Sequence, residues 1–149
     1  MTARPPRPLG PDEGSILPLL AGFVAIALAL IVVVAGASSL YLERKRLYTL
    51  ADAAALTAAQ SFPLDSVAVG EDGEVRPVLT STQVREAARS YLTSVPAPVE
   101  GLELEGAGSP DGTSAEVTLS AVWRPPLGSP LLPEGIRISV TSTARTALR

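Results

Sequence analysis

Two short acidic turns are the first places in this sequence where chemistry could occur. Glu71, Asp72 and Glu74 form the first turn, and Asp111 with Gly112 forms the second. Carboxylates can bind cations, but the spacing of the first group matches no calcium loop, so a solvated turn is the better interpretation. Asp-Gly pairs are favoured in hairpin turns for backbone reasons, which explains the second turn without a ligand. The sequence therefore predicts no metal site.

The composition argues against most catalytic chemistry. The 149 residues include no histidine and no cysteine, so the commonest general base and any thiol nucleophile are absent. The serine and threonine hydroxyls have no base to activate them, because the single lysine, Lys45, lies at a predicted membrane boundary. We therefore predict a protein that is not an enzyme and has no cofactor and no small-molecule substrate. The net charge of −3 is spread along the chain, so no basic patch indicates nucleic acid as a partner.

Asp52 is the polar residue of greatest interest, because alanines surround it at positions 51 and 53–55. One interpretation is a solvent-facing acid that pairs with a nearby basic residue of the same helix. The other is a charge that docks a partner subunit, since a single polar group in helical packing can fix its register. The sequence leaves both interpretations open.

Asp52 belongs to an Ala-rich helix that we predict over residues 43–62. The segment contains no glycine or proline, and Pro63 ends it because the residue before a proline is pushed out of the helical region. Apolar residues recur at spacings of three and four, which places them on one face that another helix or a sheet can approach closely. The residues that we expect to pack against a partner are Leu47, Leu50, Ala51, Asp52, Ala54, Ala55 and Ala58.

An uncharged run of 28 residues, 15–42, precedes this helix. A bilayer core needs about 20 mostly apolar residues in a helix, so the run predicts one transmembrane helix behind a cytoplasmic tail, residues 1–14. A signal peptide cleaved after Ala37 is the alternative. We favour the anchor, because the apolar core of 19 residues, Ile16–Val34, is longer than the roughly 7–15 residues of a signal peptide. A helix continuous through both segments would be roughly 70 Å long.

The charges that flank the run do not decide its orientation. Arg4 and Arg7 precede it, and Arg44, Lys45 and Arg46 follow it. Basic residues favour the cytoplasmic side, so the excess of one on the C-terminal side leans towards a cytoplasmic domain.

Residues 63–149 predict a small α+β domain. A capping box, Thr80 with Gln83, starts a helix over 82–94 that ends before Pro96. Alternating apolar residues over 115–123 predict a half-buried strand, which ends in Trp123. We expect this tryptophan to fill the core rather than to bind a ligand at the surface. Further strands are predicted at 67–69, 74–79, 99–105 and from 136 onward, with a turn at 106–112. The result is one helix packed on an antiparallel sheet.

The N-terminal part of the chain resembles TadE/TadG-like proteins of the tight-adherence (Tad/Flp) pilus-assembly apparatus, in their short actinobacterial type. The pattern is an apolar helix, an aromatic-plus-basic junction at Tyr41–Leu47, and an Ala-Asp-Ala-Ala-Ala-Leu block at 51–56. The resemblance covers about residues 14–60. Two features depart from related proteins: Leu19 stands where pilin precursors carry a glutamate five residues after Gly14, and the Asp-x-Ser-x-Ser metal site of long TadG-like proteins is absent.

The resemblance implies a pilin-like fold and a membrane-anchored component of pilus assembly or secretion. Its partners would be the lipid bilayer and other subunits of the apparatus, contacted through the N-terminal helix. The domain would lie outside the cytoplasm on a single-pass anchor in the cell membrane, and this expectation outweighs the excess of one basic residue. The alternative function is a generic anchored or secreted envelope protein that binds a cell-envelope ligand.

Overall fold

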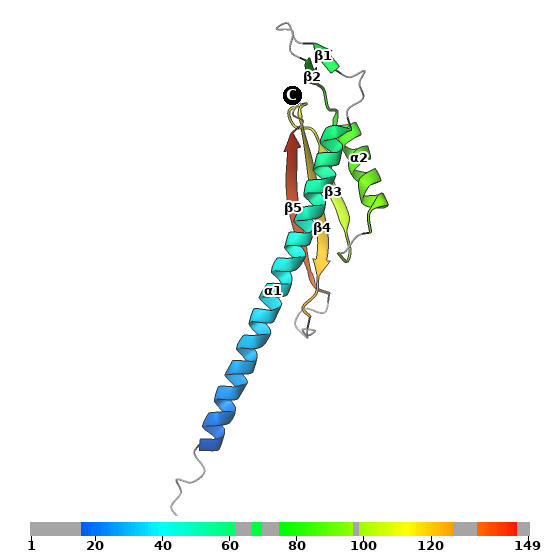
Figure 1. Ribbon diagram of the computed structural model, residues 1–149. Coiled ribbons are helices and arrows are strands. Elements are labelled where there is room, and N and C mark those ends of the chain that lie inside the picture. The colour runs from blue at the N-terminus through cyan, green and yellow to red at the C-terminus, as the bar shows by residue number, and fades with distance from the viewer. Residues whose placement is uncertain (1–15, 62–66, 70–74, 97–98, 127–133, 146–149) are drawn as a thin grey trace, which may run out of the picture.

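A single helix, α1 (Ile16–Gln60), runs for 45 residues from the N-terminal side of the chain into a small domain (Figure 1). The computed structural model describes residues 16–61, 67–69, 75–96, 99–126 and 134–145. At about 1.5 Å per residue, α1 is about 68 Å long. The predicted continuous helix is confirmed. It ends two residues before the predicted residue 62, because the Ser61 hydroxyl donates to the Ala58 carbonyl, 2.8 Å away, and closes the last turn.

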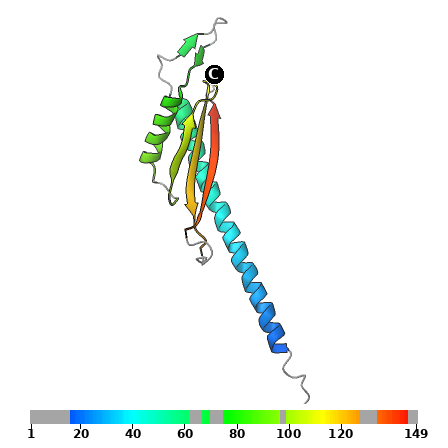
Figure 2. The same cartoon turned by 180° about the vertical axis from the view of Figure 1, so that it is seen from behind.

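A three-stranded antiparallel sheet forms the centre of the domain. Its strands are β3 (Glu103–Gly108), β4 (Ser114–Trp123) and β5 (Ile136–Arg145), in this order. The upper half of α1 crosses one face of this sheet, with the second helix, α2 (Ser81–Ser94), beside it (Figure 1). Seen from behind, the strands lie in front of α1 (Figure 2). The predicted α+β class, a long helix followed by a helix on an antiparallel sheet, is confirmed.

The alternation in β4 sorts its side chains between the two faces of the sheet. Val117 and Leu119 are fully buried on the helix-covered face, where Leu119 pairs with Val140 of β5. On the opposite face the Thr118 and Thr141 hydroxyls are 2.9 Å apart and joined by a hydrogen bond. This opposite face is polar because no described helix covers it, which is usual for an antiparallel sheet with one solvated side.

The predicted capping box begins α2. The Thr80 side chain accepts a hydrogen bond from the Gln83 backbone N–H at 3.4 Å, and the Gln83 side chain accepts one from the Thr80 N–H at 3.1 Å. Val84 and Ala88 face the core and are fully buried. The helix ends at Ser94, two residues before Pro96, as predicted.

The edge strand β3 lies further along the chain than predicted. Residues 106–108 belong to this strand and not to a turn, and the register shifts between Leu104 and Gly106. Glycine is a weak strand former, and so the sequence pattern suggested a turn. A Cβ at Gly108 would lie 3.2 Å from the Ser81 hydroxyl of α2, so the missing side chain lets the helix approach the strand.

A short hairpin precedes α2. It pairs β1 (Val67–Val69) with β2 (Val75–Pro77), so β2 is shorter than the predicted strand at 74–79. Leu79 lies beyond it, buried, and its N–H donates to the Gly112 carbonyl at 2.8 Å. The predicted acidic turn of Glu71, Asp72 and Glu74 lies outside the described residues.

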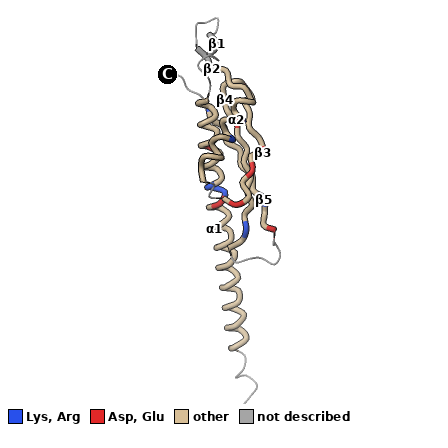
Figure 3. Tube along the Cα trace, turned by 90° about the vertical axis from the view of Figure 1, so that its right-hand side faces the viewer, with Lys and Arg blue, Asp and Glu red and all other residues tan. Residues whose placement is uncertain are grey.

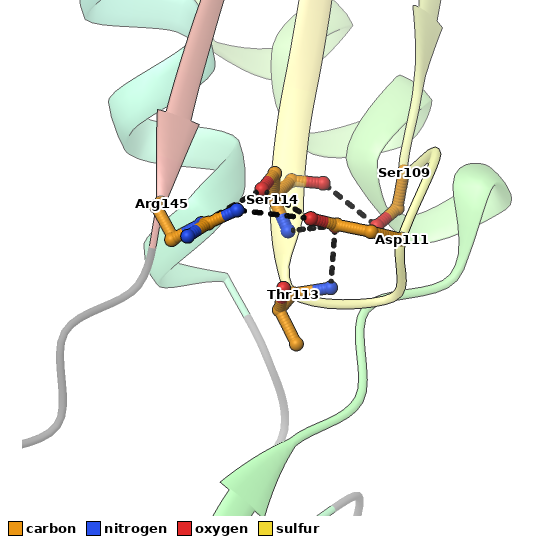
Figure 4. A network of polar contacts seen from close by, with 5 residues as sticks. All are labelled: Ser109, Asp111, Thr113, Ser114 and Arg145. Atoms are coloured by element: carbon orange, nitrogen blue, oxygen red, sulfur yellow. Dashed lines mark hydrogen bonds and ion pairs between the residues drawn. The ribbon is translucent and has the colours of Figure 1, made fainter.

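Asp111 organises the turn between β3 and β4 (Figure 4). Its carboxylate accepts hydrogen bonds from the N–H groups of Thr113 and Ser114, at 2.9 and 2.6 Å, and from the Ser114 hydroxyl at 2.8 Å. Arg145 at the end of β5 lies 3.5 Å from the same carboxylate. The hydrogen bonds from Thr113 and then Ser114 hold the pKa of Asp111 well below its usual range. Hydrogen bonds to the Asp111 carboxylate therefore support this turn in addition to a backbone that suits Asp-Gly.

We predict that Asp111→Asn lowers the Tm of the full-length protein in detergent at neutral pH. The folded-state pKa lies below the unfolded value of about 3.9, so the carboxylate stabilises the fold above that pH. This contribution is lost as the pH falls through the folded-state pKa. The Tm difference between wild type and variant should shrink below about pH 4, as followed by circular dichroism. A difference that is constant with pH would contradict this origin.

Candidate subunit-interaction site

The six apolar residues predicted to pack against a partner are buried inside their own domain. Leu50 is 6% exposed and the other five, Leu47, Ala51, Ala54, Ala55 and Ala58, are completely buried. The helix α1 contacts β4, β5 and α2, so this apolar stripe rests on the sheet and the second helix. Contact of the stripe with another subunit stays a prediction. In this structure the stripe is covered by the sheet and α2 of the same chain.

Asp52 is exposed at the edge of this packing and accepts a hydrogen bond from the Ser142 hydroxyl of β5. Within the described residues it forms no ion pair, so the predicted pairing with a basic residue of its own helix is not found there. A role in docking a partner stays a prediction. Ser142 itself was missed, although a signal existed. It is the polar member of the apolar series Ile136, Ile138 and Val140, which faces α1.

Trp123 joins the end of the sheet that lies nearest the N-terminal half of α1 to that helix. The side chain is 8% exposed, and its indole N–H donates to the Ser39 hydroxyl at 3.2 Å. The predicted burial of Trp123 is confirmed, and the residue lies beside the main apolar cluster rather than within it. Ser39 lies inside the uncharged run, so the domain already contacts α1 before the charged residues begin. The polar pair of serines at 38 and 39 was the signal for this contact in the sequence.

The described residues offer shallow hollows rather than a reaction centre. One hollow of about 300 Å³ lies between α1 and the end of α2, with Ala53, Tyr91 and Pro96 in its lining. Among the residues that the structure describes, no three His, Cys, Asp or Glu side chains are grouped to hold a metal ion. The surface of α1 is therefore the part of the molecule from which a function can be inferred.

The N-terminal half of α1, residues 16–38, which is the lower half in Figure 1, has apolar side chains that are exposed along its length; we call it the bare half. Leu17 and Phe23 are 77% and 71% exposed, and no charged side chain occurs on α1 before Glu43 (Figure 3). The helix is long and apolar enough to cross a membrane, and no residue of its most apolar stretch is buried. The two halves of α1 thus have different surroundings. The N-terminal half is exposed and apolar, as a helix in lipid would be, and the C-terminal half contributes a buried stripe to the core of the domain.

Comparison with known proteins matches residues 14–61 to the Tad family, described as "Putative Flp pilus-assembly TadE/G-like". The N-terminal helix of this chain is therefore TadE/TadG-like. This confirms the predicted family over these residues. No curated protein and no solved structure matches the chain.

The TadE/TadG-like segment coincides with α1, since the match ends one residue beyond the end of the helix at Gln60. It therefore includes both the bare half and the half buried against the sheet. A role related to pilus assembly is supported by this match, and a single-pass membrane helix is consistent with it. The sheet and α2 lie outside the matched residues.

We predict that Ala54→Leu destabilises the domain itself. Ala54 is completely buried between α1 and its own domain, so a larger side chain overpacks the contact at a typical cost of about 1–3 kcal/mol. The matched control is Ala53→Leu, one residue away, which faces the hollow between α1 and α2 and has room. Helix propensity changes little in either variant. Equal Tm values for the two variants in detergent would contradict the observed packing.

Proposed function

We propose that the chain is a non-enzymatic, single-pass membrane-anchored component of a Tad/Flp-type pilus-assembly or secretion apparatus, with its α+β domain outside the cytoplasm. The observation that carries the proposal is the coincidence of the TadE/TadG-like match with a helix whose most apolar stretch is not buried by the described chain. A bare apolar helix needs lipid or other helices around it.

We infer a division of the chain that differs slightly from the one expected from sequence. The expected cytoplasmic tail, residues 1–14, lies outside the described residues, and the described helix begins at Ile16. The segment 43–62, expected as a separate extension, and the domain at 63–149 act as one folding unit, because the buried stripe of α1 is part of the core. The domain would therefore not fold without the upper half of α1.

Other subunits would meet this protein through the lower half of α1, because its upper stripe is occupied. Outside the neighbouring backbone of the helix, a Cβ at Gly22 or Gly36 would meet no atom of the described residues within 4 Å. Glycine weakens a helix by about 1 kcal/mol relative to alanine, and nothing in the described chain compensates for it there. With Ala25 and Ala29 these glycines recur at spacings of three, four and seven, which places all four on one face. Small residues on one face let membrane helices approach closely.

We predict that Gly36→Leu weakens association with other subunits of the apparatus. A bulky side chain on this face should separate the helices at a cost of about 1–3 kcal/mol, whereas the helix itself becomes more favourable. The matched control is Ala27→Leu, which lies on the opposite face of the same membrane segment. The measurement is the yield of cross-linked partners that co-purify with the full-length protein. Unchanged yields for both variants would exclude this face as the contact.

The orientation is tested by a reporter fused after Arg149. We expect the fusion to stay in carbonate-washed membranes at full length and to show alkaline phosphatase activity without cytoplasmic fluorescence. The reverse reporter pattern would mean that the excess of basic residues after the helix sets the orientation. A soluble form that begins at Ser38 would instead support a secreted envelope protein. Such a form would retain Ser39 and its hydrogen bond to Trp123, so the domain would survive cleavage.

A further inference from the structure

Four side chains form an open face on α1 directly after its apolar half. Tyr41, Arg44, Lys45 and Tyr48 are spaced by three, one and three residues, so they lie on one face of the helix. Tyr41 is 67% exposed and Tyr48 is 41% exposed. Among the described residues, these four line an open hollow of about 440 Å³. We call this the Tyr–Arg–Lys–Tyr face.

The contact between Trp123 and Ser39 sets the level of this face relative to a membrane. It marks the membrane-proximal end of the sheet, so the helix is bare from Ile16 to residue 38. These residues rise by about 34 Å, close to the roughly 30 Å thickness of the hydrocarbon core. The step from Tyr41 to Lys45 rises by about 6 Å, which matches the depth of one headgroup layer.

The two cations on this face are not neutralised by the described part of the chain. Arg46 lies 3.4 Å from the Glu43 carboxylate, but Arg44 and Lys45 form no ion pair with any described acidic residue. Glu43 is partly covered, whereas Arg44 and Lys45 are exposed. Two basic side chains between two tyrosines thus face the level at which lipid phosphates lie.

We propose that the Tyr–Arg–Lys–Tyr face binds the headgroup of an anionic phospholipid. Arg44 and Lys45 contact the phosphate, and the hydroxyls of Tyr41 and Tyr48 donate hydrogen bonds to its oxygens. The Tyr41 ring rests at the boundary between headgroups and acyl chains, where such rings are enriched, and Tyr48 lies about 10 Å further out along the helix. The proposal rests on the anchoring part of the proposed function and not on any subunit contact. It holds for either orientation of the helix.

The test is native mass spectrometry of the full-length protein, purified in detergent and offered equal amounts of phosphatidylglycerol and phosphatidylcholine. Each basic residue near an anionic surface contributes about a fivefold gain, so wild type should retain phosphatidylglycerol with a preference of at least about tenfold. The double variant Arg44→Gln/Lys45→Gln should lose this preference. The matched control is Arg46→Gln, which removes a cation at the same level that is already bonded to Glu43 and should keep it.

Three outcomes would overturn the proposal. These are equal retention of the two lipids by wild type, equal loss of preference in the double variant and in Arg46→Gln, and displacement of phosphatidylglycerol by excess inorganic phosphate. The last would indicate a site for the free anion. All substituted side chains are exposed, and circular dichroism checks that the double variant keeps its helix content. Carbonate extraction tests anchoring separately, so a failure of lipid binding can be told apart from a failure to insert.

Discussion

The close approach of α1 to the sheet is the contact on which the rest of the domain depends. Ala51, Ala54, Ala55 and Ala58 are completely buried there, and each brings a single methyl group to the interface. Short side chains let the helix backbone lie near β4 and β5, and Leu47 and Leu50 extend the buried stripe towards the N-terminal half of α1. A small domain with few aromatic residues can bury a continuous core in this way, because one helix covers the length of two strands.

The same packing explains why the polar contacts lie where they do. Asp52 with Ser142 and Trp123 with Ser39 are at the margins of the buried stripe, not within it. Both are direct side-chain hydrogen bonds between α1 and the sheet. Within the described residues, no buried side-chain nitrogen or oxygen lacks a hydrogen-bond partner.

The parts of the fold that are set by local periodicity could be predicted from the sequence. Continuous helical spacing, the capping box at Thr80 and the alternation that ends at Trp123 each lie within a short stretch of chain. The parts that depend on distant segments could not. Gly106 and Gly108 suggest a turn by their residue type, but pairing with β4 places them in a strand. Ser142 donates its hydrogen bond to Asp52 only because β5 lies against α1 in the fold. The stripe on α1 was recognised as a packing surface, but its partner was the chain's own sheet. A pattern of small residues indicates close approach and does not say what approaches.

The helix α1 runs without interruption from its exposed half into the domain. No described turn or hinge separates the exposed half of α1 from the half that is buried against the sheet, so the direction of one half sets the direction of the other. Membrane helices tilt by about 20° on average. From the middle of the bare half to Gln60 is about 50 Å along the helix, so such a tilt displaces the far end of the domain sideways by about 17 Å. If the exposed half of α1 spans a bilayer, its tilt therefore also sets the direction in which the polar face of the sheet points.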